Sequence, residues 1–303
     1  MKIEDKKHFH LAGIIPVAGQ PLDFNLPWHD CCMPIAPDFL AVERAVVECA
    51  YAGCETIWIV CHDDMQPLIK YRLGEYVNDP VWASRPKDPR PSETRKPIPI
   101  FYVPIHPKDR DRRDCLSWSI LYGAISAYNI SVQISKWVTP DRYYVSFPYG
   151  VYPVEFLREY RPLISSYTGF YLSYENKTVK DNQYLAFTFD SQEFIKIRKN
   201  LRKKATGMYT SDLVDGFPKE TLPIGERYSA RFFTLKDVYG CMDFKKSEVV
   251  EVPWYYKIDN WNDYCDFLAS ENAKEVKKPA KYILDYHEWN LIANEDKNVD
   301  TGL

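Results

Sequence analysis

The strongest constraint on the fold is an alternation of apolar runs with helical patterns in the N-terminal part of the chain. Leu11 to Ala18 and Glu55 to Cys61 are predicted as buried strands. Residues 38–52 and 63–73 repeat apolar side chains at helical spacing. Strands that are apolar on both faces are typical of a parallel sheet covered by helices on both sides. Because crossovers between parallel strands are right-handed, this order predicts a Rossmann-like, doubly wound α/β fold with a mostly parallel sheet.

The later segments continue the alternation. Further strands are predicted at residues 100–103, 142–147, 169–173, 183–189 and 249–252, and further helices at 114–128, 153–160, 191–205, 261–270 and 281–293. Asp38 and Asp114 are suited to cap their helices, and Pro153 to open one. Gly53 and Gly74 are suited to end the two N-terminal helices.

Length and composition indicate one large α/β domain over residues 1–303. The 35.5 kDa chain is 46% hydrophobic, which is enough to fill a sizeable core. Residues 80–99 are rich in proline and charge, so we expect a surface loop insertion there. Residues 206–303 are less regular, and we expect them to pack on the same domain.

Charge and targeting signals exclude several classes of protein. A net charge of -3 and a pI near 6.1 argue against a general polyanion binder, so nucleic acid is not an expected partner. No window approaches the apolar length of a membrane span, and no apolar signal segment follows the charged N-terminus. We therefore expect a cytoplasmic protein without a membrane partner. The eight cysteines lack paired metal-site spacing, which favours reduced, mostly buried thiols.

Three short motifs add a family resemblance. The first strand leads into Gly13-Ile14-Ile15-Pro16-Val17-Ala18-Gly19-Gln20, and a helix ending in Ala52-Gly53 precedes Ile57-Trp58-Ile59-Val60. Near the C-terminus stands Ile258-Asp259-Asn260-Trp261-Asn262-Asp263-Tyr264. In this order the motifs resemble those of the sugar-nucleotide nucleotidyltransferases, the pyrophosphorylase and cytidylyltransferase group.

The resemblance implies a nucleotide or nucleotide-sugar in the crevice at the carboxyl ends of the strands. Ala18, Gly19, Gln20 and Ser117 would contact the nucleotide, and Asp259 would hold Mg²⁺, together with Asp30. A sugar-phosphate oxygen would then attack an α-phosphate and release pyrophosphate. His62 is a further candidate nucleotide contact, because it follows a predicted strand at its carboxyl end.

The sequence also departs from the family pattern. After Gly19 comes Gln20-Pro21 without the arginine that neutralises phosphate, and His29-Asp30 stands where the family has a lysine. Tyr149 stands where the family has a magnesium-binding aspartate. The alternative is therefore a catalytically inactive descendant that serves as a binding or structural module. Such motif loss suits a divergent chain, for example a phage-encoded one acting in the host cytoplasm.

Each candidate residue has a purely structural alternative. His29 and Asp30 are either a catalytic acid–base or metal pair, or a histidine that caps a loop. Asp259 is either a metal ligand or a polar residue ahead of a helix, and the turn after His62 is either a ligand contact or a helix cap by Asp63 or Asp64. The basic residues of 191–205 are either a phosphate-binding patch or a solvated helix face. No sequence feature indicates an oligomeric state.

Overall fold

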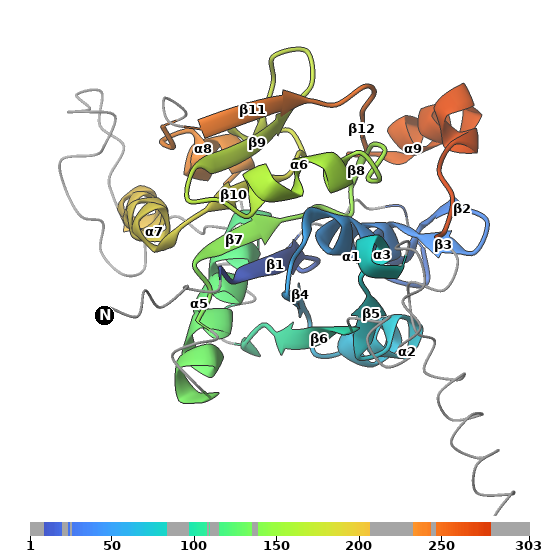
Figure 1. The fold of residues 1–303 in the computed structure, drawn as a ribbon. Helices are drawn as coiled ribbons and strands as arrows, with labels where there is room; N and C mark the ends of the chain where they lie inside the picture. Colours follow the sequence, from blue (N-terminus) through green and yellow to red (C-terminus); the bar gives the residue numbers. More distant parts are fainter. Residues whose placement is uncertain are drawn as a thin grey trace, which may run out of the picture.

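A computed structural model of the chain describes residues 9–19, 24, 26–83, 97–107, 109, 115–134, 139–206, 233–243 and 247–279. Its centre is an eight-stranded sheet with strand order β11-β9-β10-β7-β1-β4-β6-β5 (Figure 1). In chain order the strands of this sheet are β1 (Leu11–Pro16), β4 (Thr56–Cys61), β5 (Tyr76–Asn78), β6 (Pro97–Pro104), β7 (Arg142–Val145), β9 (Gly169–Ser173), β10 (Phe187–Phe189) and β11 (Ser247–Glu251).

The four central strands confirm the predicted parallel sheet. β7, β1, β4 and β6 run parallel to one another, whereas β10 and β5 pair antiparallel at their two flanks. All six residues of β1 are buried, as are all four of β7. Burial on both faces explains why these strands have continuous apolar sequences rather than alternating ones.

Eight helices accompany the sheet in the described residues: α1 (Ala41–Ala52), α2 (Gln66–Leu73), α3 (Pro80–Ala83), α5 (Leu116–Ile134), α6 (Leu157–Ile164), α7 (Ser191–Thr206), α8 (Leu235–Tyr239) and α9 (Trp261–Ala269). Shorter elements are the 3-10 turns η1 (Asp30–Cys32), η4 (Val179–Asp181) and η7 (Glu271–Lys274), and two small ribbons, β2 (Pro34–Ala36) with β3 (Phe39–Leu40), and β8 (Gly150–Val151) with β12 (Tyr256–Lys257).

Two neighbouring residues of β1 show that helices cover both faces of the sheet. Gly13 lies against Cys49 of α1, and the next residue, Ile14, lies against Gly123 of α5. Successive side chains of a strand point to opposite faces, so α1 and α5 pack on opposite sides. This confirms the doubly wound α/β class.

The predicted cap of α1 is wrong. Asp38 lies in the turn between β2 and β3 with a φ of 54°, and its carboxylate pairs with Arg72 at 2.6 Å. The helix begins at Ala41, and the Glu43 carboxylate accepts the Leu40 N–H at 2.7 Å instead. Pairing of β2 with β3 extends the chain through Leu40 and so delays the helix. Gly53 ends α1 at a φ of 90° and Gly74 ends α2 at 73°, as predicted.

Two other helix starts are also later than predicted. α2 begins at Gln66 after Met65, so neither Asp63 nor Asp64 caps it. α6 begins at Leu157 rather than Pro153 and contains Pro162. Tertiary contacts explain this helix, because Arg161 binds Asp79 at 2.6 Å and donates to the carbonyls that end α1.

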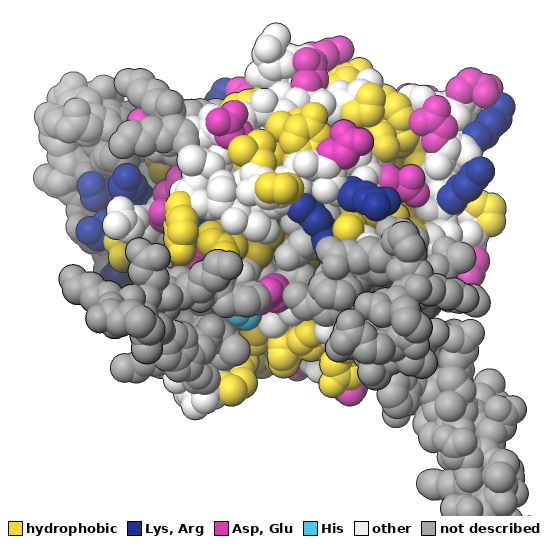
Figure 2. Space-filling view, viewed as in Figure 1, with side chains coloured by type: hydrophobic (Ala, Val, Ile, Leu, Met, Phe, Trp, Pro, Cys, Tyr) yellow, Lys and Arg dark blue, Asp and Glu magenta, His cyan; other side chains and the backbone are white. Residues whose placement is uncertain are grey.

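Several predictions lie outside the described residues. They are the Asp114 cap, the helix at 281–293 and residues 84–96 of the predicted loop insertion; α3 and β6 flank that last range. On α7, Lys196, Arg198, Lys199, Arg202 and Lys203 are exposed, and Lys and Arg side chains gather at the left of Figure 2, where α7 lies. None of the helices in the described part of the chain has the length and apolarity that a bilayer crossing requires.

A buried ion pair joins α1 to β7 and the segment after it. Arg44 and Glu48 are 1% and 0% exposed, and their side chains meet at 3.0 Å. Arg44 also donates to the Phe147 carbonyl at 2.6 Å. The Glu48 carboxylate accepts three further hydrogen bonds of 2.7–2.8 Å, from the hydroxyls of Tyr144, Ser146 and Tyr152. These four hydrogen-bond donors compensate the Glu48 carboxylate for the hydration that it loses on burial.

Replacing Glu48 therefore leaves a buried, uncompensated guanidinium. We expect Glu48→Gln to lower the free energy of unfolding by about 3–5 kcal/mol in urea titrations. The matched control is Glu248→Gln on exposed β11, for which we expect a change within about 0.5 kcal/mol. The double variant Arg44→Met/Glu48→Gln should recover part of the loss. A loss no greater than that of the control would contradict the assigned network.

Candidate functional site

The carboxyl ends of β7 and β1 form a topological switch point. From β1 the chain leads through α1 to β4 on one side, whereas β7 is reached from β6 through α5 and lies on the other side of β1. In open α/β sheets, a crevice forms at the carboxyl ends of two neighbouring strands when the chain leaves them toward opposite sides of the sheet. Open α/β sheets bind their ligands in such a crevice. The candidate site is therefore the edge at which β7, β1 and β4 end.

The turn after β1, formed by Ala18 and Gly19, packs closely against the start of α5. The Ala18 N–H donates to the Val60 carbonyl at 3.0 Å, and the Ala18 carbonyl accepts from the Ser119 hydroxyl at 2.8 Å. Gly19 has a φ of 90°, and a Cβ there would lie 2.5 Å from the backbone of Cys115. Only glycine fits this approach. Ala18 and Gly19 are thus at the predicted edge, while Gln20 lies outside the described residues.

The structure gives His62 and Ser117 different surroundings. His62 follows the carboxyl end of β4 and is half-buried, with its carbonyl accepting the N–H groups of Met65 and Gln66. Ser117 is only 1% exposed, and its carbonyl accepts the Tyr239 hydroxyl at 3.2 Å. The Ser117 hydroxyl has no hydrogen-bond partner within the described ranges. Both nucleotide contacts remain predictions, and His62 is the more accessible.

His29 and Asp30 begin the short turn η1. The His29 Nδ1 accepts the Cys31 N–H at 3.2 Å, so this histidine caps the turn. Asp30 is 8% exposed and lies near the fully buried Tyr149. Burial raises the pKa of the Tyr149 hydroxyl well above its ordinary value, and the neighbouring Cys31 and Asp30 raise it further. A catalytic role for His29 and Asp30 stays a prediction.

The small ribbon β8–β12 brings Asp259 to the same edge. β8 follows the carboxyl end of β7, and in the ribbon Lys257 lies opposite Gly150. The Tyr184 hydroxyl donates to one oxygen of the Asp259 carboxylate at 2.7 Å, and the Lys257 ammonium forms an ion pair with the other. Lys257 also stands 5.0 Å from the centre of the Tyr184 ring. Asp259 is 38% exposed and Lys257 21%, so a ligand can reach both.

These groups do not fit magnesium. The ion prefers carboxylates, phosphates and water, whereas Asp259 already holds an ammonium and a phenol. Burial, followed by the charge of Asp259, raises the pKa of Tyr184, so its phenol remains a neutral donor. Across the described residues no group of three or more His, Cys, Asp or Glu side chains is placed to hold a metal ion. Lys257 supplies the positive charge beside Asp259 instead.

Lys257 and Tyr184 were not among the residues singled out from the sequence. Lys257 stands two positions before Asp259 on an extended segment, so the two side chains share a face, and this spacing could have indicated the pair. Tyr184 carried no such signal, because its contact with Asp259 joins residues far apart in the chain.

Comparison with known proteins identifies the fold alone. No protein-family model matches the chain, and no curated protein matches it. Among solved structures it is similar to a protein described as glucose-1-phosphate thymidylyltransferase from Bacillus anthracis, with a TM-score of 0.54 and 11% identity over 90% of this chain and 98% of that one. It is also similar to an apo UDP-glucose pyrophosphorylase, with a TM-score of 0.50 and 13% identity over 89% and 100% of the two chains. These neighbours are nucleotide-diphospho-sugar transferases with a Rossmann-like fold.

The Gly19 turn gives a test of the edge geometry. Gly19→Ala adds a Cβ against backbone atoms that cannot rotate away, on top of the strain of a positive φ. Gly53→Ala is the matched control, since its φ is also 90° but its Cβ would meet only the Arg161 side chain at 3.5 Å. We expect a loss of about 1–2 kcal/mol for Gly53→Ala and about 1–3 kcal/mol more for Gly19→Ala in urea unfolding. Equal losses would mean that the turn does not pack on α5.

Tyr149 and Tyr152 allow a second matched comparison. Both are almost fully buried, but the Tyr149 hydroxyl has no partner among the described residues, whereas that of Tyr152 donates to Glu48 at 2.7 Å. Tyr149→Phe removes an unsatisfied polar group and should leave the unfolding free energy unchanged or raise it by up to about 1 kcal/mol. Tyr152→Phe should lower it by about 1.5–3 kcal/mol. A comparable loss for Tyr149→Phe in the same titration would contradict this.

Proposed function

We propose that this chain binds a nucleotide or a nucleotide-sugar in the crevice where β7 and β1 end. One observation carries the proposal: at the switch point, the Gly19 turn and the Lys257–Asp259 pair stand at the ends of neighbouring strands. A glycine turn lets a backbone approach a pyrophosphate closely, and a lysine ammonium attracts phosphate oxygens. Two solved structures with this fold carry the names of enzymes that act on sugar phosphates and nucleotide-sugars, which agrees with the proposal.

Within this crevice we assign the nucleotide contacts to Ala18, Gly19 and His62, with Gln20 and Ser117 as the predicted remainder. Lys257 neutralises one phosphate, and Asp259 fixes the ammonium by holding it against Tyr184. The pair thus supplies the positive charge beside Asp259 that the family resemblance assigned to Mg²⁺.

The geometry supports binding better than nucleotidyl transfer. A transfer of this kind needs strong positive charge on the α-phosphate as pyrophosphate leaves. The buried carboxylate of Asp30 and the neutral phenol of Tyr149 supply none. The protein is accordingly a nucleotide-binding module built on a transferase fold.

A thermal-shift screen against the common nucleoside triphosphates and nucleotide-sugars tests this, because a ligand that binds only the folded state raises Tm. We expect one of them to raise Tm equally in Mg²⁺ and in EDTA. Lys257→Met should weaken that ligand about tenfold in calorimetric titration, equivalent to about 1.4 kcal/mol, and Lys257→Arg should keep most of the affinity. Lys177→Met, in an exposed turn, is the control and should change nothing.

The possible outcomes distinguish nucleotide binding, the role of Lys257 and transferase activity. No response to any nucleotide would overturn it. A response that requires Mg²⁺ would retain the binding site but refute the assigned role of Lys257. Release of pyrophosphate from a triphosphate and a sugar phosphate would show a transferase.

A further inference from the structure

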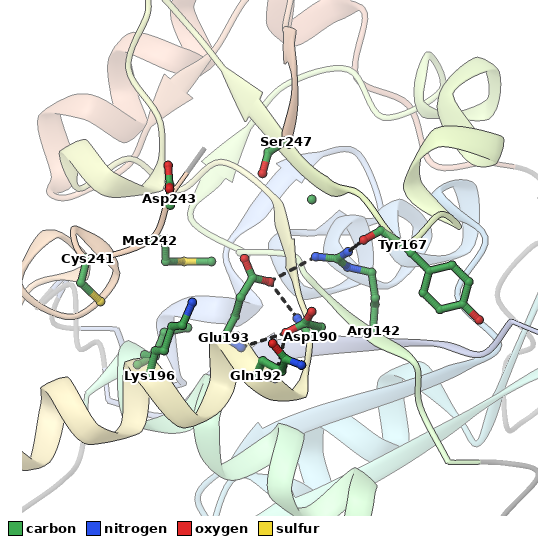
Figure 3. A pocket seen from close by; sticks show the side chains of 12 residues that line it. Arg142, Tyr167, Asp190, Gln192, Glu193, Lys196, Cys241, Met242, Asp243 and Ser247 are labelled. Atoms are coloured by element: carbon green, nitrogen blue, oxygen red, sulfur yellow. Dashed lines mark hydrogen bonds and ion pairs between the residues drawn. The ribbon is translucent and has the colours of Figure 1, made fainter. Parts of the chain in front are cut away.

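A cavity of about 460 Å³ lies at the amino ends of the strands, on the edge of the sheet opposite the candidate site. Its wall includes Arg142, Gly169 and Ser247, which are the first residues of β7, β9 and β11. α7 supplies Glu193 and Lys196 (Figure 3). We call it the amino-edge pocket. Its volume lies in the range of small-molecule sites, and it shares no residue with the proposed nucleotide crevice.

The ion pair of Arg142 and Glu193 lies at the centre of the pocket, and not all of its polar atoms have hydrogen-bond partners. The Arg142 side chain is 3% exposed; it donates to the Tyr167 carbonyl and pairs with Glu193 at 3.1 Å, but its Nε has no partner within the described residues. One Glu193 oxygen accepts from Arg142 and from the Asp190 N–H. Figure 3 shows the other oxygen turned away from these bonds, toward Ser247. The pocket therefore offers this second Glu193 oxygen as a hydrogen-bond acceptor.

The remaining wall combines polar and apolar groups. Lys196, one turn after Glu193 on α7, points its ammonium toward the same space in Figure 3. Met242 and Ile197, which are 6% and 1% exposed, provide an apolar surface. Hydroxyl groups both donate and accept, and the C–H faces of a sugar ring pack on apolar side chains, so a polyhydroxyl molecule matches this wall.

The charge of the wall excludes strongly anionic ligands. The carboxylates of Asp190, Glu193 and Asp243 outnumber the cations of Arg142 and Lys196. Arg142 is already neutralised by Glu193, and the Asp190 carboxylate accepts the first N–H groups of α7 at 2.8 Å. A phosphate would meet more negative than positive charge and would lose its hydration.

From this geometry we infer that the amino-edge pocket binds a neutral sugar, a mono- or disaccharide without phosphate. Ligand hydroxyls accept from Lys196 and donate to the Glu193 oxygen that lies outside the bonds to Arg142 and Asp190. This site stands independently of the proposed nucleotide site.

The signal of the Met242 methyl group reports on this pocket directly. Full-length protein labelled with [methyl-¹³C]methionine is titrated with D-glucose, D-galactose, D-mannose and maltose, and the Met242 signal is assigned with Met242→Leu. We expect a saturable shift of that signal for at least one sugar. Lys196→Met should weaken this binding about tenfold, the effect of losing one charged hydrogen bond. Lys199→Met, an exposed lysine on the same helix outside the pocket wall, should leave it unchanged.

Three results would overturn the inference. They are an unmoved Met242 signal with every sugar, equal binding by Lys196→Met and the unmodified chain, and a stronger Met242 response to glucose 6-phosphate or to glycine than to the neutral sugars. Because nucleotides are absent from this titration, its result does not depend on the proposed nucleotide site.

Discussion

The buried pair of Arg44 and Glu48 fixes the part of the molecule on which the candidate site stands. Arg44 holds the Phe147 carbonyl and Glu48 holds the Tyr152 hydroxyl. Between these two anchors lies β8, against which β12 pairs and so carries Lys257 and Asp259 to the carboxyl edge. Removing one partner of such a pair leaves an uncompensated buried charge, so the network is sensitive to any single loss. A polar network on α1 that touches no ligand thereby sets the position of the residues that would.

The long elements could be predicted from the sequence because burial on both faces leaves continuous apolar runs. The strand at 169–173 was placed at its observed bounds, and the helix at 191–205 within one residue. β8 and β12 were not predicted, since strands of two residues have no periodicity and exist only through pairing with each other. The start of α6 was missed for a similar reason, because Arg161 and its partners on other elements determine where that helix packs.

The edge of the sheet at which the candidate residues lie could be inferred from the sequence, but their contacts could not. The glycine turn lies at this edge because β1 ends there with its parallel neighbours, whereas the motif around Asp259 reaches it through the β8–β12 ribbon. The partners of Asp259 could not be inferred, since Tyr184 reaches it from another segment and the Lys257 ion pair depends on the ribbon. The amino-edge pocket also could not be predicted from the sequence. It combines the first residues of strands that are separated by long stretches of chain with residues of α7.

Under the proposed function, the Lys257–Asp259 pair would supply positive charge for a phosphate at the carboxyl edge. In the pattern that the sequence resembles, two carboxylates offset the two positive charges of Mg²⁺. Here the neutral phenol of Tyr149 stands at one of those positions with the buried carboxylate of Asp30 near it, and the Lys257 ammonium offsets the Asp259 carboxylate. The charge within the Lys257–Asp259 pair sums to zero, but its chemistry differs from that of a metal ion. An ammonium donates hydrogen bonds to phosphate oxygens, whereas a metal ion also polarises the phosphorus centre as a Lewis acid. In the proposed nucleotide site, Lys257 would therefore contact a phosphate without acting as a Lewis acid.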